Sequence, residues 1–72
     1  MTALRKYSVS LRGHRTSFTL EPEFHAELKA IAEERKLALA ALIFEIDTER
    51  EEKVNLSSAL RLFVLRSLKK SA

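Results

Sequence analysis

The chain has 72 residues, which is enough for one small domain and too short for several. It contains no cysteine, so disulfide bridges and cysteine-ligated metal sites are excluded. Oligomerisation is the remaining common way for so small a core to become stable. Residues 1–20 carry four basic and no acidic side chains, and residues 54–72 repeat that balance. Positive charge held at both ends suits a polyanionic partner.

The N-terminal part alternates between polar and apolar side chains, which is the pattern of a strand with one buried face. Gly13 interrupts the alternation, so either a hairpin turns there or one long edge strand bends there. We expect a strand over residues 14–20, preceded by residues 1–13 as a basic arm or an extra strand. The outward face of the expected strand carries three polar side chains, Arg15, Ser17 and Thr19.

Three helices are expected downstream, over residues 22–35, 38–53 and 56–70. A proline opens the first helix, where its missing N–H costs nothing, and apolar residues then recur at helical spacing in each segment. Asn55 or Ser57 can cap the last helix. That helix is apolar nearly all round, which predicts contact with a second chain. The core predicted for the dimer comprises Phe18, Leu20, Phe24, Leu28, Ile31, Leu42, Ile43, Ile46, Leu60 and Phe63.

A single short strand leaves backbone donors and acceptors unpaired along its edges. The same strand of a second chain can pair with it antiparallel, and the resulting two-stranded ribbon fits the major groove of DNA. Arginine can bond guanine bidentately, while serine and threonine can bond base edges. On this interpretation Arg15, Ser17 and Thr19 make DNA-base contacts, whereas the same alternation fits equally well a strand whose outward face is simply solvated.

Three segments, GHRTS, LEPEF and NLSSALRLFVL, resemble the ribbon-helix-helix DNA-binding proteins of the Arc/MetJ class. The resemblance is closer to a family of short bacterial stand-alone members and covers about residues 6–68. It implies a mainly α fold with a short N-terminal β-strand, in an intertwined homodimer with an intersubunit antiparallel β-ribbon. The third helix would be an additional C-terminal helix.

The resemblance also implies a DNA-phosphate anchor at the start of the second helix, where free N–H groups favour anions. Relatives usually read Gly-Leu-Ser where this chain has Lys36, Leu37 and Ala38, so the turn glycine and the polar cap are absent. The DNA-phosphate contacts predicted for this chain are Arg12, His14, Lys36, Ala38, Leu39 and Ala40.

These features predict a sequence-specific DNA-binding homodimer in the cytoplasm, acting as a transcriptional regulator and most simply as a repressor that occludes a promoter. The alternative is a protein–protein adaptor dimer, or an antitoxin-type module, whose acidic tract or third helix binds a further protein partner. The acidic tract runs from Glu45 to Glu52.

No chemistry other than binding is expected. A Gly-rich phosphate loop is missing, and the serines have no histidine nearby in sequence, so we expect neither catalysis nor a cofactor. His14 and His25 make a poor metal pair because they fall on different elements and lack a second ligand cluster. The longest apolar segment spans about half of the roughly 20 residues that cross a bilayer, so no membrane partner is expected.

Overall fold

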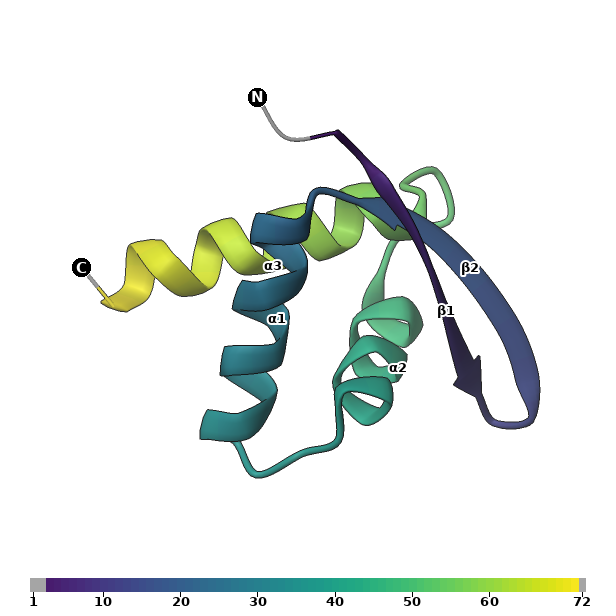
Figure 1. Ribbon diagram of the computed structural model, residues 1–72, viewed down its shortest axis with the longest axis horizontal. Coiled ribbons are helices and arrows are strands. Elements are labelled where there is room, and N and C mark those ends of the chain that lie inside the picture. The colour runs from purple at the N-terminus through teal and green to yellow at the C-terminus, as the bar shows by residue number, and fades with distance from the viewer. Residues whose placement is uncertain (1–2, 72) are drawn as a thin grey trace.

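The computed structural model describes residues 3–71, with side chains through residue 70, and shows a β-hairpin followed by three helices (Figure 1). Residues 1–2 of the expected N-terminal arm, and residue 72, lie outside the described residues. The elements are β1 (Arg5–Leu11), β2 (His14–Leu20), α1 (Pro22–Glu34), α2 (Leu39–Glu49) and α3 (Leu56–Ser71).

The two strands pair antiparallel within one chain, with Leu11 opposite His14 beside the turn. Of the two readings of Gly13, the structure therefore shows the hairpin. Arg12 and Gly13 form the turn with φ values of 49° and 82°, and positive φ at both central residues is what a type I′ turn requires. The segment before Gly13 is accordingly an extra strand over Arg5–Leu11.

The core joins both strands to all three helices. Alternation along the hairpin turns one face inward, and each helix contributes its apolar stripe. Within the single chain the predicted core residues fall into two groups. Phe24, Ile31 and Phe63 are partly buried against the cluster, whereas Phe18, Leu20, Leu28, Leu42, Ile43, Ile46 and Leu60 are buried. Leu11, Leu56 and Val64 are buried as well.

Helix α2 is shorter than the expected segment over residues 38–53, because it ends at Glu49. Arg50 leaves the helical conformation with ψ 148°. The Arg50 side chain connects the last turn of α2 to the segment before α3. Its Nε donates to Asp47 Oδ1 at 2.7 Å, and a terminal guanidinium nitrogen donates to the Val54 carbonyl at 2.8 Å. The acidic tract is therefore divided between the end of α2 and the connection to α3.

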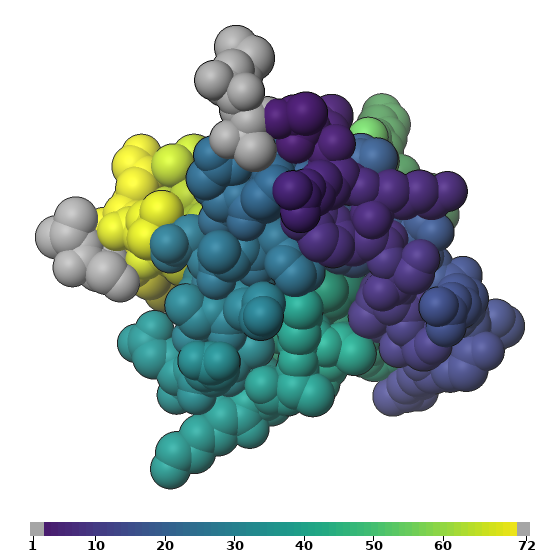
Figure 2. Space-filling view, in the orientation of Figure 1, coloured from purple at the N-terminus to yellow at the C-terminus, as the bar shows by residue number. Residues whose placement is uncertain are grey.

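The helices support the hairpin from behind, with α2 against β1 and α3 against β2, while α1 packs on both other helices. An ion pair joins the start of α1 to α3, with Arg61 Nε 2.9 Å from Glu21 Oε1. The hydrogen bond from Arg61 is the main reason that the pKa of Glu21 is lowered. Figure 2 shows β1 exposed at the surface, with the end of the hairpin projecting beyond the helices at the lower right.

Candidate nucleic-acid interface

The outward face of β2 is fully displayed to solvent. Arg15, Ser17 and Thr19 are exposed, whereas Phe18 and Leu20, which alternate with them, are buried. Burial of the large apolar side chains fixes the strand's register, because a slip by one residue would exchange the two faces. The three predicted base-contacting side chains therefore share one face and are brought together by the strand itself.

The backbone of these same residues faces the edge of β2 opposite β1. In a tight two-residue turn the flanking residues form a hydrogen-bonded pair, and such pairs alternate along an antiparallel ladder. With Leu11 opposite His14, the backbone N–H and C=O groups of Arg15, Ser17 and Thr19 point away from β1. In the described chain the sheet has only two strands, so no third strand covers this edge.

One group on that edge is already bonded to a helix. The Thr19 N–H donates to Ser57 Oγ at 3.3 Å, which agrees with the orientation derived from the ladder. Asn55 rather than Ser57 caps α3, because Asn55 Oδ1 accepts the Ser58 N–H at 2.9 Å. The start of α3 therefore lies beside the C-terminal part of β2, and the rest of the edge is open.

Two of the predicted phosphate contacts lie at the end of the hairpin, Arg12 in the turn and His14 as the first residue of β2, and both are exposed. The Arg12 guanidinium carbon lies 4.7 Å from the centroid of the Phe44 ring on α2. A cation over an aromatic face at this distance is attracted to it, so Phe44 holds the guanidinium group of Arg12 beside α2. A positive charge is thus held at the tip of the hairpin.

The other predicted phosphate contacts lie at the connection between α1 and α2. Lys36 has φ 59° and ends α1, with its N–H bonded to the Glu33 carbonyl and the Leu37 N–H bonded to the Ala32 carbonyl. This is the Schellman pattern, in which a glycine normally occupies the left-handed position. Lys36 therefore occupies the position that glycine normally takes in this motif, at an energetic cost to the backbone.

Helix α2 begins without a side-chain cap, with Ala38 as its N-cap residue. Its first N–H groups therefore have no side-chain acceptor and remain available to an anion. Ala38 is exposed, and Leu39 and Ala40 are partly buried. The start of α2 and the hairpin turn lie toward the same end of the molecule, at the bottom of Figure 1, although α2 separates them. The predicted phosphate contacts thus form two clusters rather than one.

Strand β1 is held onto the helices by an aromatic stack. Tyr7 lies flat on His25 of α1, with ring centroids 3.9 Å apart, and its other neighbour is Phe18, at 5.7 Å. Burial, and then the charge of Lys29, lower the pKa of His25. The neutral imidazole is therefore favoured, and stacking is the role that the structure gives this histidine.

The sequence-based interpretation assigned no role to the outward face of β1. Lys6, Ser8 and Ser10 are exposed there, on the same side of the hairpin as the predicted base contacts. The signal that identifies them is present in the sequence as a short repeat, KYSVSL and RTSFTL, which becomes meaningful once the strands are known to pair.

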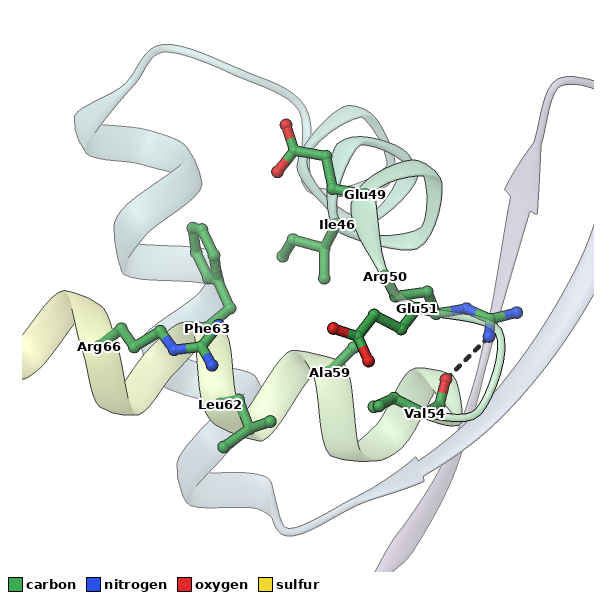
Figure 3. A pocket seen from close by; sticks show the side chains of 9 residues that line it. All are labelled: Ile46, Glu49, Arg50, Glu51, Val54, Ala59, Leu62, Phe63 and Arg66. Atoms are coloured by element: carbon green, nitrogen blue, oxygen red, sulfur yellow. Dashed lines mark hydrogen bonds between the residues drawn. The ribbon is translucent and has the colours of Figure 1, made fainter.

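A hollow of about 380 Å³ lies between the end of α2 and the middle of α3 (Figure 3). Ile46 and Phe63 give it an apolar wall, while Glu49, Glu51 and Arg66 contribute charges of both signs. It is open to solvent and lies away from the outward face of the hairpin. Its mixed lining gives no catalytic constellation.

Among residues 3–71, no group of three or more His, Cys, Asp or Glu side chains is arranged to hold a metal ion. The structure places His14 on β2 and His25 on α1. The helices of the described chain include none with the length and hydropathy needed to cross a membrane.

The chain was compared with models of known protein families, with curated proteins and with solved structures. The family described as "Ribbon-helix-helix domain" matches residues 4–68, which includes the hairpin and most of the three helices. No curated protein and no solved structure matches the chain.

Proposed function

Because the chain belongs to the ribbon-helix-helix family, we propose that it is a sequence-specific DNA-binding homodimer that regulates transcription. Domains of this family generally bind DNA, dimerise and regulate transcription. The observation that carries the proposal for this chain is the outward face of β2. It presents Arg15, Ser17 and Thr19 to solvent on a strand whose register is fixed by burial.

Dimerisation is supported by the open edge of β2. A second copy can pair antiparallel along this edge, centred on Ser17, so that each Arg15 faces a Thr19 of the other copy. The pairing uses backbone groups that β1 leaves free. Near Thr19 it replaces the long hydrogen bond to Ser57. The outward residues of two identical strands then form a two-fold symmetric ribbon.

Apolar surface also supports a second chain. Phe24, Ile31 and Phe63 are only partly buried. On α3, Leu62, Leu65 and Leu68 are between 40% and 50% exposed. They recur every three residues and so share one side of the helix, and a continuous exposed apolar surface is typical of a site that contacts another protein.

The chemistry of the ribbon suits the major groove. Arginine matches the two acceptors of guanine, and hydroxyl groups bond base edges at close approach because the side chains are short. The start of α2 and the hairpin turn supply phosphate contacts that set the position of the dimer.

Repression follows from occupancy of a promoter alone, and we place the protein in the bacterial cytoplasm, with a binding rather than a catalytic role.

A second candidate function is favoured by the exposed leucines of α3. They would let the dimer act as an adaptor or antitoxin-type module that binds a further protein. The two functions differ in their response to salt. DNA binding through several basic side chains weakens steeply as salt rises, whereas apolar docking responds little.

The test is fluorescence anisotropy of labelled duplexes across a salt series. A random library is first enriched for duplexes that bind the wild-type protein, and affinities are then measured for enriched and random duplexes. Arg15→Ala should lose about 1–3 kcal/mol per base contact on the enriched duplex and little on the random one. Arg66→Ala, on the exposed side of α3, is the control of equal charge. A folded wild-type dimer that binds no duplex at low salt would contradict the proposal.

A further inference from the structure

The two strands of the hairpin are near copies of each other. Residues 6–11 read Lys-Tyr-Ser-Val-Ser-Leu, and residues 15–20 read Arg-Thr-Ser-Phe-Thr-Leu. Each strand therefore has a basic residue, then a serine, then a second hydroxyl residue at alternate positions, and both end on leucine. The outward rows of the two strands therefore carry the same chemistry, whereas the proposed DNA-base contacts involve β2 alone.

The register places the two rows on one continuous face. Ser8 lies opposite Ser17, Lys6 lies opposite Thr19, and Ser10 lies opposite Arg15. Each basic residue thus faces a hydroxyl residue, and the pattern is nearly two-fold symmetric about the central serine pair. All of these outward side chains are exposed, so any polyanion lying against β2 meets β1 on the same face.

The width of the sheet decides what β1 can touch. In the proposed dimer the order is β1, β2 and then the same two strands of the second copy in reverse. Neighbouring strands are about 4.8 Å apart, so the outer strands are about 14 Å apart. The major groove is about 12 Å wide. The central ribbon therefore fits within the groove, while the outer strands meet its walls, which are the sugar-phosphate backbones.

We infer that β1 is a second DNA-contacting strand, whose outward row of Lys6, Ser8 and Ser10 binds the phosphate backbone on either side of the groove read by β2. This inference rests on the proposed function. Lysine and serine are suited to it, because phosphate contacts come from lysine, arginine and hydroxyl side chains. Neither ion pair found among the described residues uses Lys6, so its charge is available.

Strand β1 is also held firmly enough to place these side chains. Leu11 is buried at the turn end of the strand, and Tyr7 stacks on His25 and Phe18. These contacts lie on the opposite face from the outward row, so they stay in place when DNA binds. Lys6 can alternatively serve only to prevent two sheets from pairing edge to edge. Only the phosphate-binding role predicts a change in the salt dependence of DNA binding when Lys6 is replaced.

The experiment uses Lys6→Gln, with Lys69→Gln near the end of α3 as the control of equal charge. Wild type and both variants are titrated against the enriched and the random duplex over a salt series. A phosphate contact in each chain lowers the slope of log affinity against log salt by about 2 per dimer. We expect this reduction for Lys6→Gln on both duplexes, with equal fold losses, and an unchanged slope for Lys69→Gln.

Three outcomes overturn the inference. An unchanged slope and affinity for Lys6→Gln would mean that β1 only supports β2. A loss on the enriched duplex alone would mean that β1 reads bases, so that one hairpin is the groove-reading ribbon. An equal loss for Lys69→Gln would reduce the effect to net charge. Arg15→Ala is measured in parallel, because retained binding and specificity through Arg15 keep the proposed function even where the β1 inference fails.

Discussion

The ring of Tyr7 lies parallel to the imidazole of His25, with 2° between the ring planes and 3.9 Å between the centroids. This contact joins the middle of β1 to the first helix. It links the position of the outer strand to the charge state of one histidine, because burial lowers the pKa of His25.

Acidification should therefore loosen the hairpin. The pKa of His25 is lower in the folded chain than in the unfolded chain, where it is about 6.5. Above the unfolded pKa, His25 is neutral in both states and takes nothing from the free energy of unfolding. As the pH falls below that value and through the folded pKa, the free energy of unfolding decreases, because the unfolded chain takes up the proton more readily than the folded chain. Thermal unfolding followed by circular dichroism should show less of this loss in His25→Phe than in wild type. The exposed His14→Gln should behave as wild type does, and an identical pH profile in His25→Phe would disprove the link.

Replacing the turn glycine should weaken the hairpin through the backbone alone. Gly13 has φ 82°, and a Cβ atom added there meets nothing within 4 Å. Gly13→Ala should therefore lower the free energy of unfolding by about 1–2 kcal/mol, which is the cost of the left-handed conformation for a residue with a side chain. Urea unfolding measures this change. Gly13→Asn should cost less, because asparagine tolerates this conformation. Equal losses of stability in Gly13→Ala and Gly13→Asn would mean that the left-handed backbone conformation does not determine the loss.

Lys36→Gly should stabilise the fold and weaken DNA binding at the same time. The left-handed conformation at φ 59° costs a lysine about 1 kcal/mol that glycine does not lose. Urea unfolding should show this gain for Lys36→Gly and not for Lys36→Ala, which keeps the unfavourable conformation. Both variants should lose similar affinity for random duplexes at low salt. Unchanged affinity in both would remove Lys36 from the predicted phosphate contacts.

Two phenylalanines can report whether a second chain covers the core. Phe18 is 5% exposed within one chain, so Phe18→Ala should cost about 3–5 kcal/mol whatever the oligomeric state. Phe63 is partly buried and is covered in part by Arg35, whose guanidinium carbon lies 5.3 Å from the ring centroid. In a lone chain Phe63→Ala should cost clearly less than Phe18→Ala.

A dimer changes the expectation for Phe63 alone. If a second chain buries its ring, Phe63→Ala should cost as much as Phe18→Ala and its unfolding midpoint should depend on protein concentration. Urea unfolding at several protein concentrations, together with sedimentation equilibrium, measures both quantities. A small cost with no concentration dependence would contradict the proposed dimer.

Much of the architecture could be predicted from periodicity. The alternation over the hairpin and the helical spacing downstream both reflect which side chains must leave water, and this determines the inward positions of Phe18 and Leu20 as well as the start of α1 at Pro22. The outward placement of Arg15 follows from the same alternation, because neighbouring side chains on a strand point to opposite faces.

Features that depend on contacts distant in sequence were less accessible. Pairing between β1 and β2 depends on a turn whose first residue is Arg12, whereas asparagine or aspartate is the usual signal at that position. The end of α2 at Glu49 depends on hydrogen bonds from Arg50 to residues on both sides of it. The choice of Asn55 as the cap leaves Ser57 for Thr19, which only the packing of α3 on β2 makes possible.

The two left-handed basic residues, Arg12 and Lys36, have an evolutionary consequence. Within residues 3–71 they are the only residues other than glycine with positive φ, and both belong to the predicted phosphate contacts. Selection for heat resistance alone would favour asparagine or glycine at both positions, because such residues remove the backbone strain. Selection for operator occupancy would keep the basic side chains. Under the proposed function, stability and DNA affinity therefore favour different residues at positions 12 and 36, so homologues from hot environments should more often carry glycine or asparagine there.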